Sequence, residues 1–191
     1  MKIYTLPLLV LLVVSAFNGS ASAHELAASR ATLVLRDSQH LAVSFFVDYA
    51  GVLHQVLAPQ LPFEEFALQH AAMPPQVFAA KVTAAQARLQ GGTHLALQDG
   101  SVIALTQWAW PDTVAVQQAL QQRAMQSAVA PGDHAHTVQT EIRAQAQSAK
   151  ANDFAAVSLT VAPEFKQMLV VSYQPKQVWV APGTPSPTIR F

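Results

Sequence analysis

Residues 30–48, RATLVLRDSQHLAVSFFVD, alternate apolar with polar or small side chains on both arms of a short polar turn. On the first arm Ala31, Leu33 and Leu35 share one side, and Asp37 and Ser38 follow as turn residues. The second arm carries its apolar side chains at Leu41, Val43, Phe45 and Val47. A spacing of two is that of a strand with one buried face. The segment therefore predicts a β-hairpin.

Further strands are predicted along the rest of the chain, most densely in its last third. They lie at 93–98, 101–110, 137–143, 157–161, 168–174, 177–181 and 188–191. Asp99-Gly100 joins the first two of these as a hairpin turn. Between the strands, segments rich in Ala, Gln and Leu predict helices at 63–72, at 76–90 and from Asp112, as a cap, to about Ser127.

This succession of elements predicts a mainly β protein with inserted helices, of the α+β class. The predicted fold is an immunoglobulin-like β-sandwich of seven or eight short strands drawn from these nine segments, and an open α+β sheet is the alternative. Trp108 and Trp110, on one face of their strand, are predicted to lie in the sandwich core together with Trp179 and Tyr173. An aromatic platform for a sugar or a partner protein is the other interpretation.

The N-terminus has the order of segments found in a secretory signal peptide. Lys2 precedes an apolar run at 6–17, and Ala21-Ser22-Ala23 supplies the small residues that signal peptidase requires. We therefore expect residues 1–23 to be removed and residues 24–191 to form a single exported, periplasmic domain. An uncleaved N-terminal anchor is the alternative. No second apolar run of about 18 residues follows in the sequence, so we expect no membrane span after cleavage.

The composition excludes several classes of function. Eleven basic side chains balance eleven acidic ones, so no positive field is available to hold nucleic acid by counterion release. The chain has no cysteine, which rules out disulfides, thiolate metal sites and a cysteine nucleophile. The sequence contains no Gly-x-Ser-x-Gly elbow, phosphate loop or dinucleotide fingerprint. We therefore expect a protein that is not an enzyme.

Cleavage after Ala23 would make His24 the first residue of the mature chain. Its free α-amine and its imidazole Nδ1 can chelate one Cu(II) or Ni(II) ion, because the amine has an unperturbed pKa of about 7.7–8.0 and a metal displaces its proton at neutral pH. His134 and His136 lie two residues apart, so on an extended backbone they point to one face, which is the apolar face if the strand at 137–143 extends backward. These three histidines are the candidate metal ligands. The alternative is an unliganded terminus and a solvated loop.

The beginning of the expected mature chain resembles the exported N-terminal region of HupE/UreJ-type membrane proteins. The resemblance lies in Ala23-His24-Glu25-Leu26, followed by an alternating strand at 31–36. The later stretches Tyr173-Gln174-Pro175 and Gln177-Val178-Trp179-Val180 are compatible with such a region. Members of that family are nickel or cobalt permeases whose soluble segment faces outward. This chain lacks their downstream membrane helices, so the resemblance implies a stand-alone periplasmic relative with His24 as a ligand.

Together these features predict an exported metal-homeostasis accessory that binds Cu or Ni and has an envelope or membrane metal-transport protein as its partner. A metal-free envelope interaction module is the first alternative. It would use the exposed side of the helix that begins near Asp112, whose glutamines are Gln117, Gln118, Gln121, Gln122 and Gln126. An oxidative copper enzyme acting on polysaccharide is the second alternative. The other histidines are expected at the surface or at the edge of the core, namely His40, His54, His70 and His94.

Overall fold

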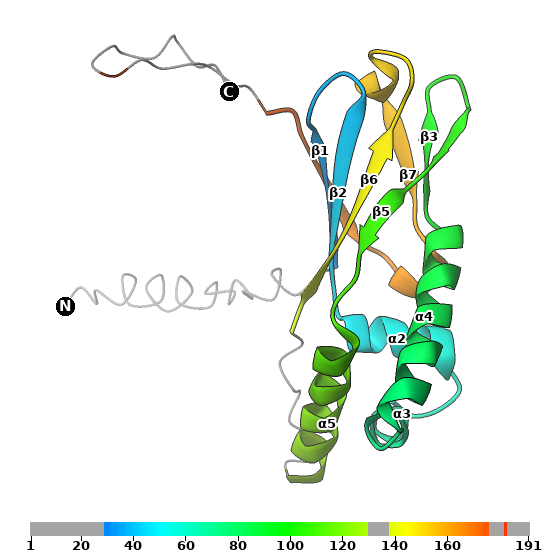
Figure 1. The fold of residues 1–191 in the computed structure, drawn as a ribbon, viewed down its shortest axis with the longest axis vertical. Coiled ribbons are helices and arrows are strands. Elements are labelled where there is room, and N and C mark those ends of the chain that lie inside the picture. Colours follow the sequence, from blue (N-terminus) through cyan, green and yellow to red (C-terminus); the bar gives the residue numbers. More distant parts are fainter. Residues whose placement is uncertain (1–28, 130–137, 176–181, 183–191) are drawn as a thin grey trace, which may run out of the picture.

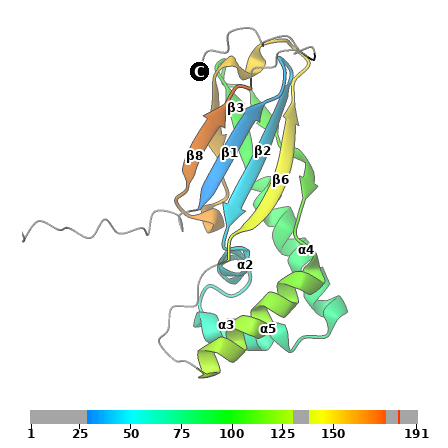
Figure 2. The same ribbon diagram turned by 90° about the vertical axis from the view of Figure 1, so that its left-hand side faces the viewer.

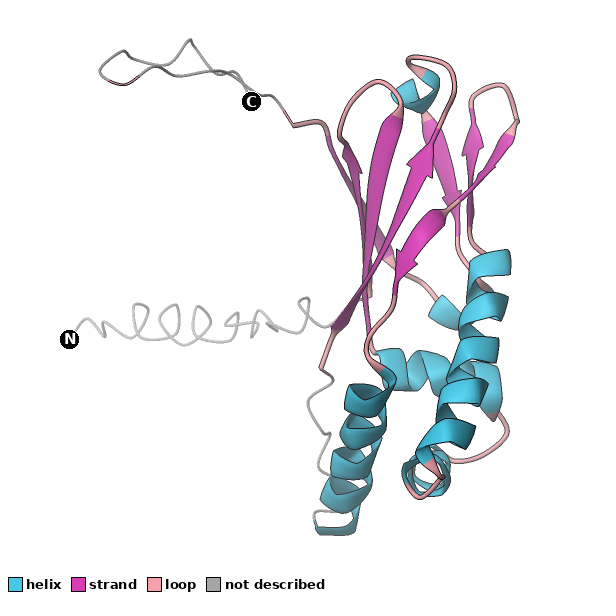
Figure 3. Cartoon of the chain, viewed as in Figure 1, coloured by secondary structure: helices cyan, strands magenta, loops and turns pink. Residues whose placement is uncertain are grey.

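The computed structural model describes residues 29–129, 138–175 and 182 (Figure 1). Within these residues the chain forms eight β-strands, four α-helices and two short 3₁₀-helices. Figure 3 shows the strands packed together, with the α-helices gathered toward one end of them. The predicted mixed α+β class is confirmed. The strands predicted at 177–181 and 188–191 lie outside the described residues.

The larger sheet contains the predicted hairpin. Its strand order is β5-β6-β2-β1-β8. The bounds are β1 Arg30–Leu35, β2 His40–Val47, β5 Thr106–Ala109, β6 Thr140–Gln147 and β8 Leu169–Tyr173. β1 and β2 pair antiparallel, with Leu33 opposite Val43, which confirms the hairpin. β8 pairs with β1 in parallel, and the other neighbouring pairs of this sheet are antiparallel.

The smaller sheet has the strand order β4-β3-β7, and its pairs are antiparallel. The bounds are β3 His94–Leu97, β4 Val102–Ala104 and β7 Val157–Thr160. The prediction of one strand over 101–110 is wrong, because β4 belongs to this sheet whereas β5 belongs to the larger one. The Leu105 side chain between them is buried. Gln107, inside β5, has a φ of 50°, and the pairing of β5 with β6 is irregular between Thr106 and Ala109.

The α-helices of the described residues lie at one end of the sheets (Figures 1 and 2). They are α2 Tyr49–Leu57, α3 Phe63–Ala71, α4 Pro75–Gly91 and α5 Thr113–Val129. The last three confirm the predicted helices, and Asp112 caps α5 by accepting a hydrogen bond from the Ala115 amide at 2.9 Å. α2 is absent from the sequence prediction, because Gly51 and two valines lower its helix propensity. Burial of Tyr49 and Leu53 stabilises it instead.

In the part of the chain that the structure describes, no helix combines the length and the hydropathy needed to cross a bilayer.

The core is centred on the inward-facing side chains of β2. Leu41, Val43, Phe45 and Val47 are buried there. The ring of Phe45 lies nearly parallel to the rings of Trp108 and Phe165, with centroids 5.7 and 5.5 Å away. Trp108 in turn stacks on Trp110 at 5.1 Å. Both tryptophans are partly buried and pack against the core from its edge, so the prediction that they lie within the core is confirmed only in part.

Tyr173 does not join this cluster. It lies at the end of β8 and is 58% exposed, so the prediction that it is a core residue is wrong. Among the described residues β8 is an edge strand of the larger sheet, and edge position is a property that side-chain alternation does not encode. Trp179, predicted to share the core, lies outside the described residues.

Candidate functional site

The three predicted metal ligands, His24, His134 and His136, lie outside the described residues. The structure does describe the points at which their two segments join the fold. The first segment leads into β1 at Arg30, and the second leads through Val138 into β6 at Thr140. The backward extension of β6 through Val138 is not found, because β6 begins at Thr140 and Val138 is 74% exposed.

The two attachment points lie at the same end of the larger sheet. Arg30 of β1 is opposite Phe46 of β2, and Phe46 is opposite Glu141 of β6. Two interstrand spacings therefore separate Arg30 from Glu141, a distance of about 10 Å. His24 precedes Arg30 by six residues and His136 precedes Glu141 by five. Since an extended chain covers about 3.3 Å per residue, either segment is long enough to cross this interval.

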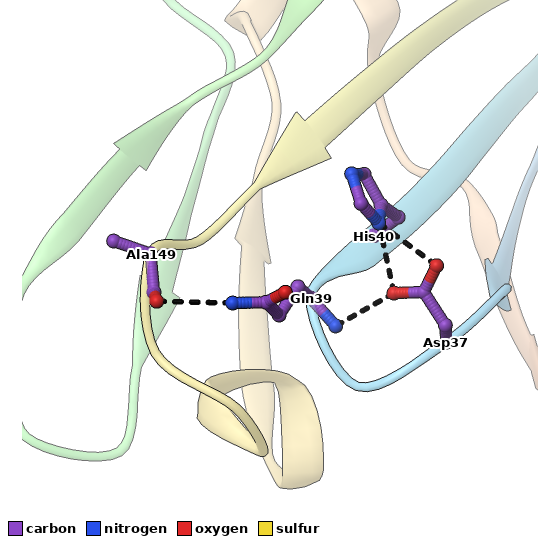
Figure 4. A network of polar contacts seen from close by, with 4 residues as sticks. All are labelled: Asp37, Gln39, His40 and Ala149. Atoms are coloured by element: carbon purple, nitrogen blue, oxygen red, sulfur yellow. Dashed lines mark hydrogen bonds and ion pairs between the residues drawn. The ribbon is translucent and has the colours of Figure 1, made fainter.

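The other histidines have partners within the fold. The His40 ring Nδ1 lies 2.8 Å from both carboxylate oxygens of Asp37 (Figure 4). The Gln39 amide donates to the same carboxylate at 2.8 Å, and the Gln39 side chain donates to the Ala149 carbonyl at 3.0 Å. The Gln39 amide and, next to it, the His40 ring hold the pKa of Asp37 below its ordinary value. This network fixes the β1–β2 turn against the segment that follows β6.

His54 and His70 belong to an aromatic cluster between α2 and α3. The His54 Nε2 lies 2.8 Å from the Leu61 carbonyl, and the His70 Nδ1–H donates to the Phe66 carbonyl at 2.8 Å. The Phe66 ring lies between the two imidazoles, 5.0 Å from one centroid and 4.2 Å from the other. His70 is only 4% exposed, deeper than the predicted core edge. His94, at the beginning of β3, is half-buried.

Burial lowers the pKa of His70, and the nearby charges of Lys81 and His54 act in the same direction, against the hydrogen bond to Phe66. The fold therefore favours the neutral imidazole. As the pH falls below the unfolded-state pKa of about 6.5, the unfolded chain takes up a proton that the folded chain resists. We expect stability to fall from pH 7 toward pH 5, with His70 contributing at most about 1.4 kcal/mol per pH unit.

Urea unfolding between pH 7.5 and 5 measures this contribution. The His70→Gln variant should unfold with a flatter pH dependence than the wild type, because it lacks the titrating group. The control is Leu68→Gln, which changes a side chain that is 59% exposed on the same helix and removes no titratable group; it should keep the wild-type slope. An unchanged slope in His70→Gln would show that the buried imidazole is not the group responsible.

Among the described residues, no three His, Asp or Glu side chains converge in a way that could hold a metal ion.

A cavity of about 210 Å³ opens where α5 meets the beginnings of α2 and β6. On its wall, the Arg123 Nη1 lies 2.9 Å from the Asp48 Oδ1. A Cβ at position 51 would lie only 2.7 Å from the Asp48 Oδ2, so Gly51 leaves the space that this carboxylate occupies. Burial raises the pKa of the neighbouring Tyr49 to about 12, and its hydroxyl stays protonated at neutral pH. Among the described residues of its wall, the Asp48 carboxylate is therefore paired with Arg123 and the Tyr49 hydroxyl is protonated.

Sequence patterns alone did not reveal this ion pair. Arg123 lies in a helix whose polar side chains are otherwise glutamines and was not distinguished from them. One feature of the sequence could have indicated it: Arg123 is the only charged residue of α5, and a lone charge on an amphipathic helix often has a partner. Its guanidinium also lies over the Phe63 ring, 5.3 Å from the centroid.

The glutamine face of α5 is exposed as predicted, with one exception. Gln118, Gln121, Gln122 and Gln126 are exposed. Gln117 is only 7% exposed, and its side-chain amide donates to the carbonyls of His70 and Met73 at 3.2 and 2.8 Å. Its prediction as a surface residue is wrong because it satisfies the carbonyls at the end of α3, a tertiary contact.

No protein-family model, curated protein or solved structure matches this chain.

Proposed function

We propose that the mature protein begins at His24 and binds one Cu(II) or Ni(II) ion as a periplasmic accessory in metal homeostasis. The α-amine and imidazole of His24 are the first two ligands. His134 and His136 supply the remaining imidazole nitrogens of a planar or T-shaped set, the arrangement that Cu(II) favours. An envelope or membrane metal-transport protein is the partner that delivers or receives the ion. This function requires no catalytic group.

The observation that carries this proposal is the row formed by Arg30, Phe46 and Glu141. The two segments that bear the histidines join the larger sheet at this row, about 10 Å apart. A shared site requires such convergence, whereas attachment at opposite ends of a strand would have separated the segments by about 20 Å. The chemistry and spacing that mark these histidines as ligands do not depend on strand pairing, so the convergence of their segments is independent support.

Elemental analysis of protein purified from its native periplasm, followed by Cu(II) titration of the metal-free form, tests the proposal. We expect one bound ion per chain. Replacing His134 and His136 together with alanine should weaken Cu(II) binding at least about 10-fold, because the ion loses protein nitrogens beyond the first residue. A processed wild-type protein that takes up neither Cu(II) nor Ni(II) would overturn the proposal.

The matched control is His40→Ala. His40 is a partly exposed histidine at the first position of β2. Phe46 lies near the other end of the same strand, so His40 is about 20 Å from the row that contains Phe46, at 3.3 Å per residue. Its removal should leave the affinity for Cu(II) unchanged. Equal affinities for the double variant and this control would remove His134 and His136 from the site.

A second candidate function, a metal-free envelope interaction module, is supported by the surface of α5. The single charge of this helix, Arg123, is turned inward, with its side chain 15% exposed. The outward side therefore presents neutral glutamines together with Val114 and Met125, which are 55% and 62% exposed. Native protein that contains no metal but co-purifies with an envelope protein would favour this function.

The proposal extends to the finer form of the fold, an immunoglobulin-like sandwich. Two facing sheets and a buried aromatic core support it. An experimental structure that includes residues 176–191 tests it, through the position that the predicted strands at 177–181 and 188–191 take in the two sheets.

A further inference from the structure

β8 is an edge strand with one side of its backbone unpaired among the described residues (Figure 2). The Leu169 amide donates to the Ser29 carbonyl at 2.8 Å, so this amide points toward β1. Amides alternate in direction along a strand. The amides of Val170 and Ser172 therefore point to the free edge. An edge of this kind is a template for pairing with another extended segment.

An apolar cleft of about 380 Å³ lies on the inner side of the same strand, between β8 and β7. No charged residue lines it. The apolar side chains that line it include Leu33, Leu41, Phe154, Val157, Leu159 and Val170. The opposite side of the sandwich is bridged by the continuous chain from β4 through Leu105 to β5. The two sheets are thus open to each other on the side where β8 lacks a neighbour.

The side chains of β8 are exposed in a way that a soluble edge strand rarely tolerates. Leu169, Val170 and Tyr173 are 59%, 50% and 58% exposed, and the strand contains no charged residue. Val170 lies on the inner face opposite Ala31, whereas Leu169 lies on the outer face. Tyr173, at the end of the strand, is paired with Val34 on the outer face and also borders the cleft. An extended strand with alternating side chains fits this edge, because it can pair with the free backbone groups and cover apolar side chains on both faces.

We propose that residues 177–181 of the same chain, QVWVA, occupy this position as an antiparallel neighbour of β8. Gln174, Pro175 and Lys176 separate the two segments, and Pro175 suits the second position of a type I turn. Tethering by so short a connection raises the effective concentration of the segment at the edge to the millimolar range. This proposal is independent of metal binding.

The hydrophobic pattern of residues 177–181 determines which of their side chains face the cleft. Val178 and Val180 face the cleft, because the alternative register would bury the polar Gln177 there. Trp179 then lies on the outer face opposite Val171, diagonal to Leu169 and Tyr173, within reach of an aromatic side chain. One segment thus covers the exposed apolar residues on both faces of β8.

Amide hydrogen exchange of the intact chain, resolved by residue, tests the proposal. In the wild type we expect the Val170 and Ser172 amides to be protected. The double substitution Val178→Asp/Val180→Asp should accelerate their exchange at least about 10-fold, the factor that corresponds to one net hydrogen bond. The Leu169 and Val171 amides, which point to β1, should remain protected. Wild-type Val170 and Ser172 amides that exchange like those of an open loop would overturn the proposal.

The matched control is Gln177→Asp/Ala181→Asp, which adds the same charge at positions of the other parity. It should leave the Val170 and Ser172 amides protected. Equal loss of protection in both double variants, or loss in the control alone, would overturn the facing proposed here. Protection that survives both variants and rises with protein concentration would assign the edge to a second copy of the chain instead. Protection that appears only with a co-purified protein would assign it to that partner.

Discussion

Replacing His24 with alanine is expected to weaken Cu(II) binding about 100-fold or more. The substitution removes the imidazole and leaves the α-amine as the only donor of the first residue. The affinity falls because the chelate effect is lost: two donors on one residue act at a high effective concentration toward the same ion. Competition titration against a chromophoric chelator measures the change, with Ni(II) as a second ion.

The fold itself should not respond to this substitution. β1 begins at Arg30, six residues beyond the altered position, so the thermal unfolding midpoint of the metal-free protein should match that of the wild type. In the wild type the midpoint should rise with Cu(II) concentration, as it does for any ligand that binds only the folded state. Equal affinities for the His24→Ala and wild-type proteins would mean that the His24 imidazole is not a ligand.

Phe45→Ala is expected to produce the largest loss of stability, about 3–5 kcal/mol, the usual cost of removing a fully buried phenylalanine. The ring is 0% exposed and stacks between Trp108 and Phe165. Removing it leaves a void between a strand of the larger sheet and the 3₁₀-helix Pro163–Phe165. Urea unfolding followed by tryptophan fluorescence measures the change in unfolding free energy.

The neighbouring Phe46→Ala is the matched control, because it deletes the same ring from the opposite face of β2. Phe46 is half-buried, and the Arg30 guanidinium lies over its ring at 4.6 Å. We expect a loss of about 1 kcal/mol, since part of the ring already contacts solvent. Equal losses for the two variants would contradict the assignment of Phe45 as the centre of the core.

Local sequence patterns were sufficient for the elements that form one regular face. The hairpin at 30–48 was predictable because a spacing of two puts its apolar residues on one side. α3, α4 and α5 were predictable because prolines, a capping Asp112 and paired glycines mark their ends. The same patterns did not predict α2, whose residues become helical through burial of Tyr49 and Leu53.

For the candidate site, too, one part could be predicted from the sequence and another part depends on the tertiary structure. The chemistry of His24, His134 and His136 is legible in the sequence, because a residue's donors do not depend on its neighbours. Whether the two segments converge depends on the pairing of β1, β2 and β6, which only the strand register determines. The ion pair of Asp48 and Arg123 and the burial of Gln117 were missed for this reason. Both are contacts between residues far apart in the chain.

By itself, the sequence determined the α+β class, the central hairpin and most helix positions of this protein, because these follow from short-range periodicity and backbone preference. Only the tertiary structure decided that residues 101–110 divide between two sheets and that the beginnings of β1 and β6 share one end of a sheet. It also decided that β8 lies, within the described part of the chain, at a sheet edge beside an open cleft. The physical reason is that sheet order and edge position arise from hydrogen bonds between distant strands. Strands that alternate equally well can occupy a centre or an edge, and burial in the assembled core selects between them.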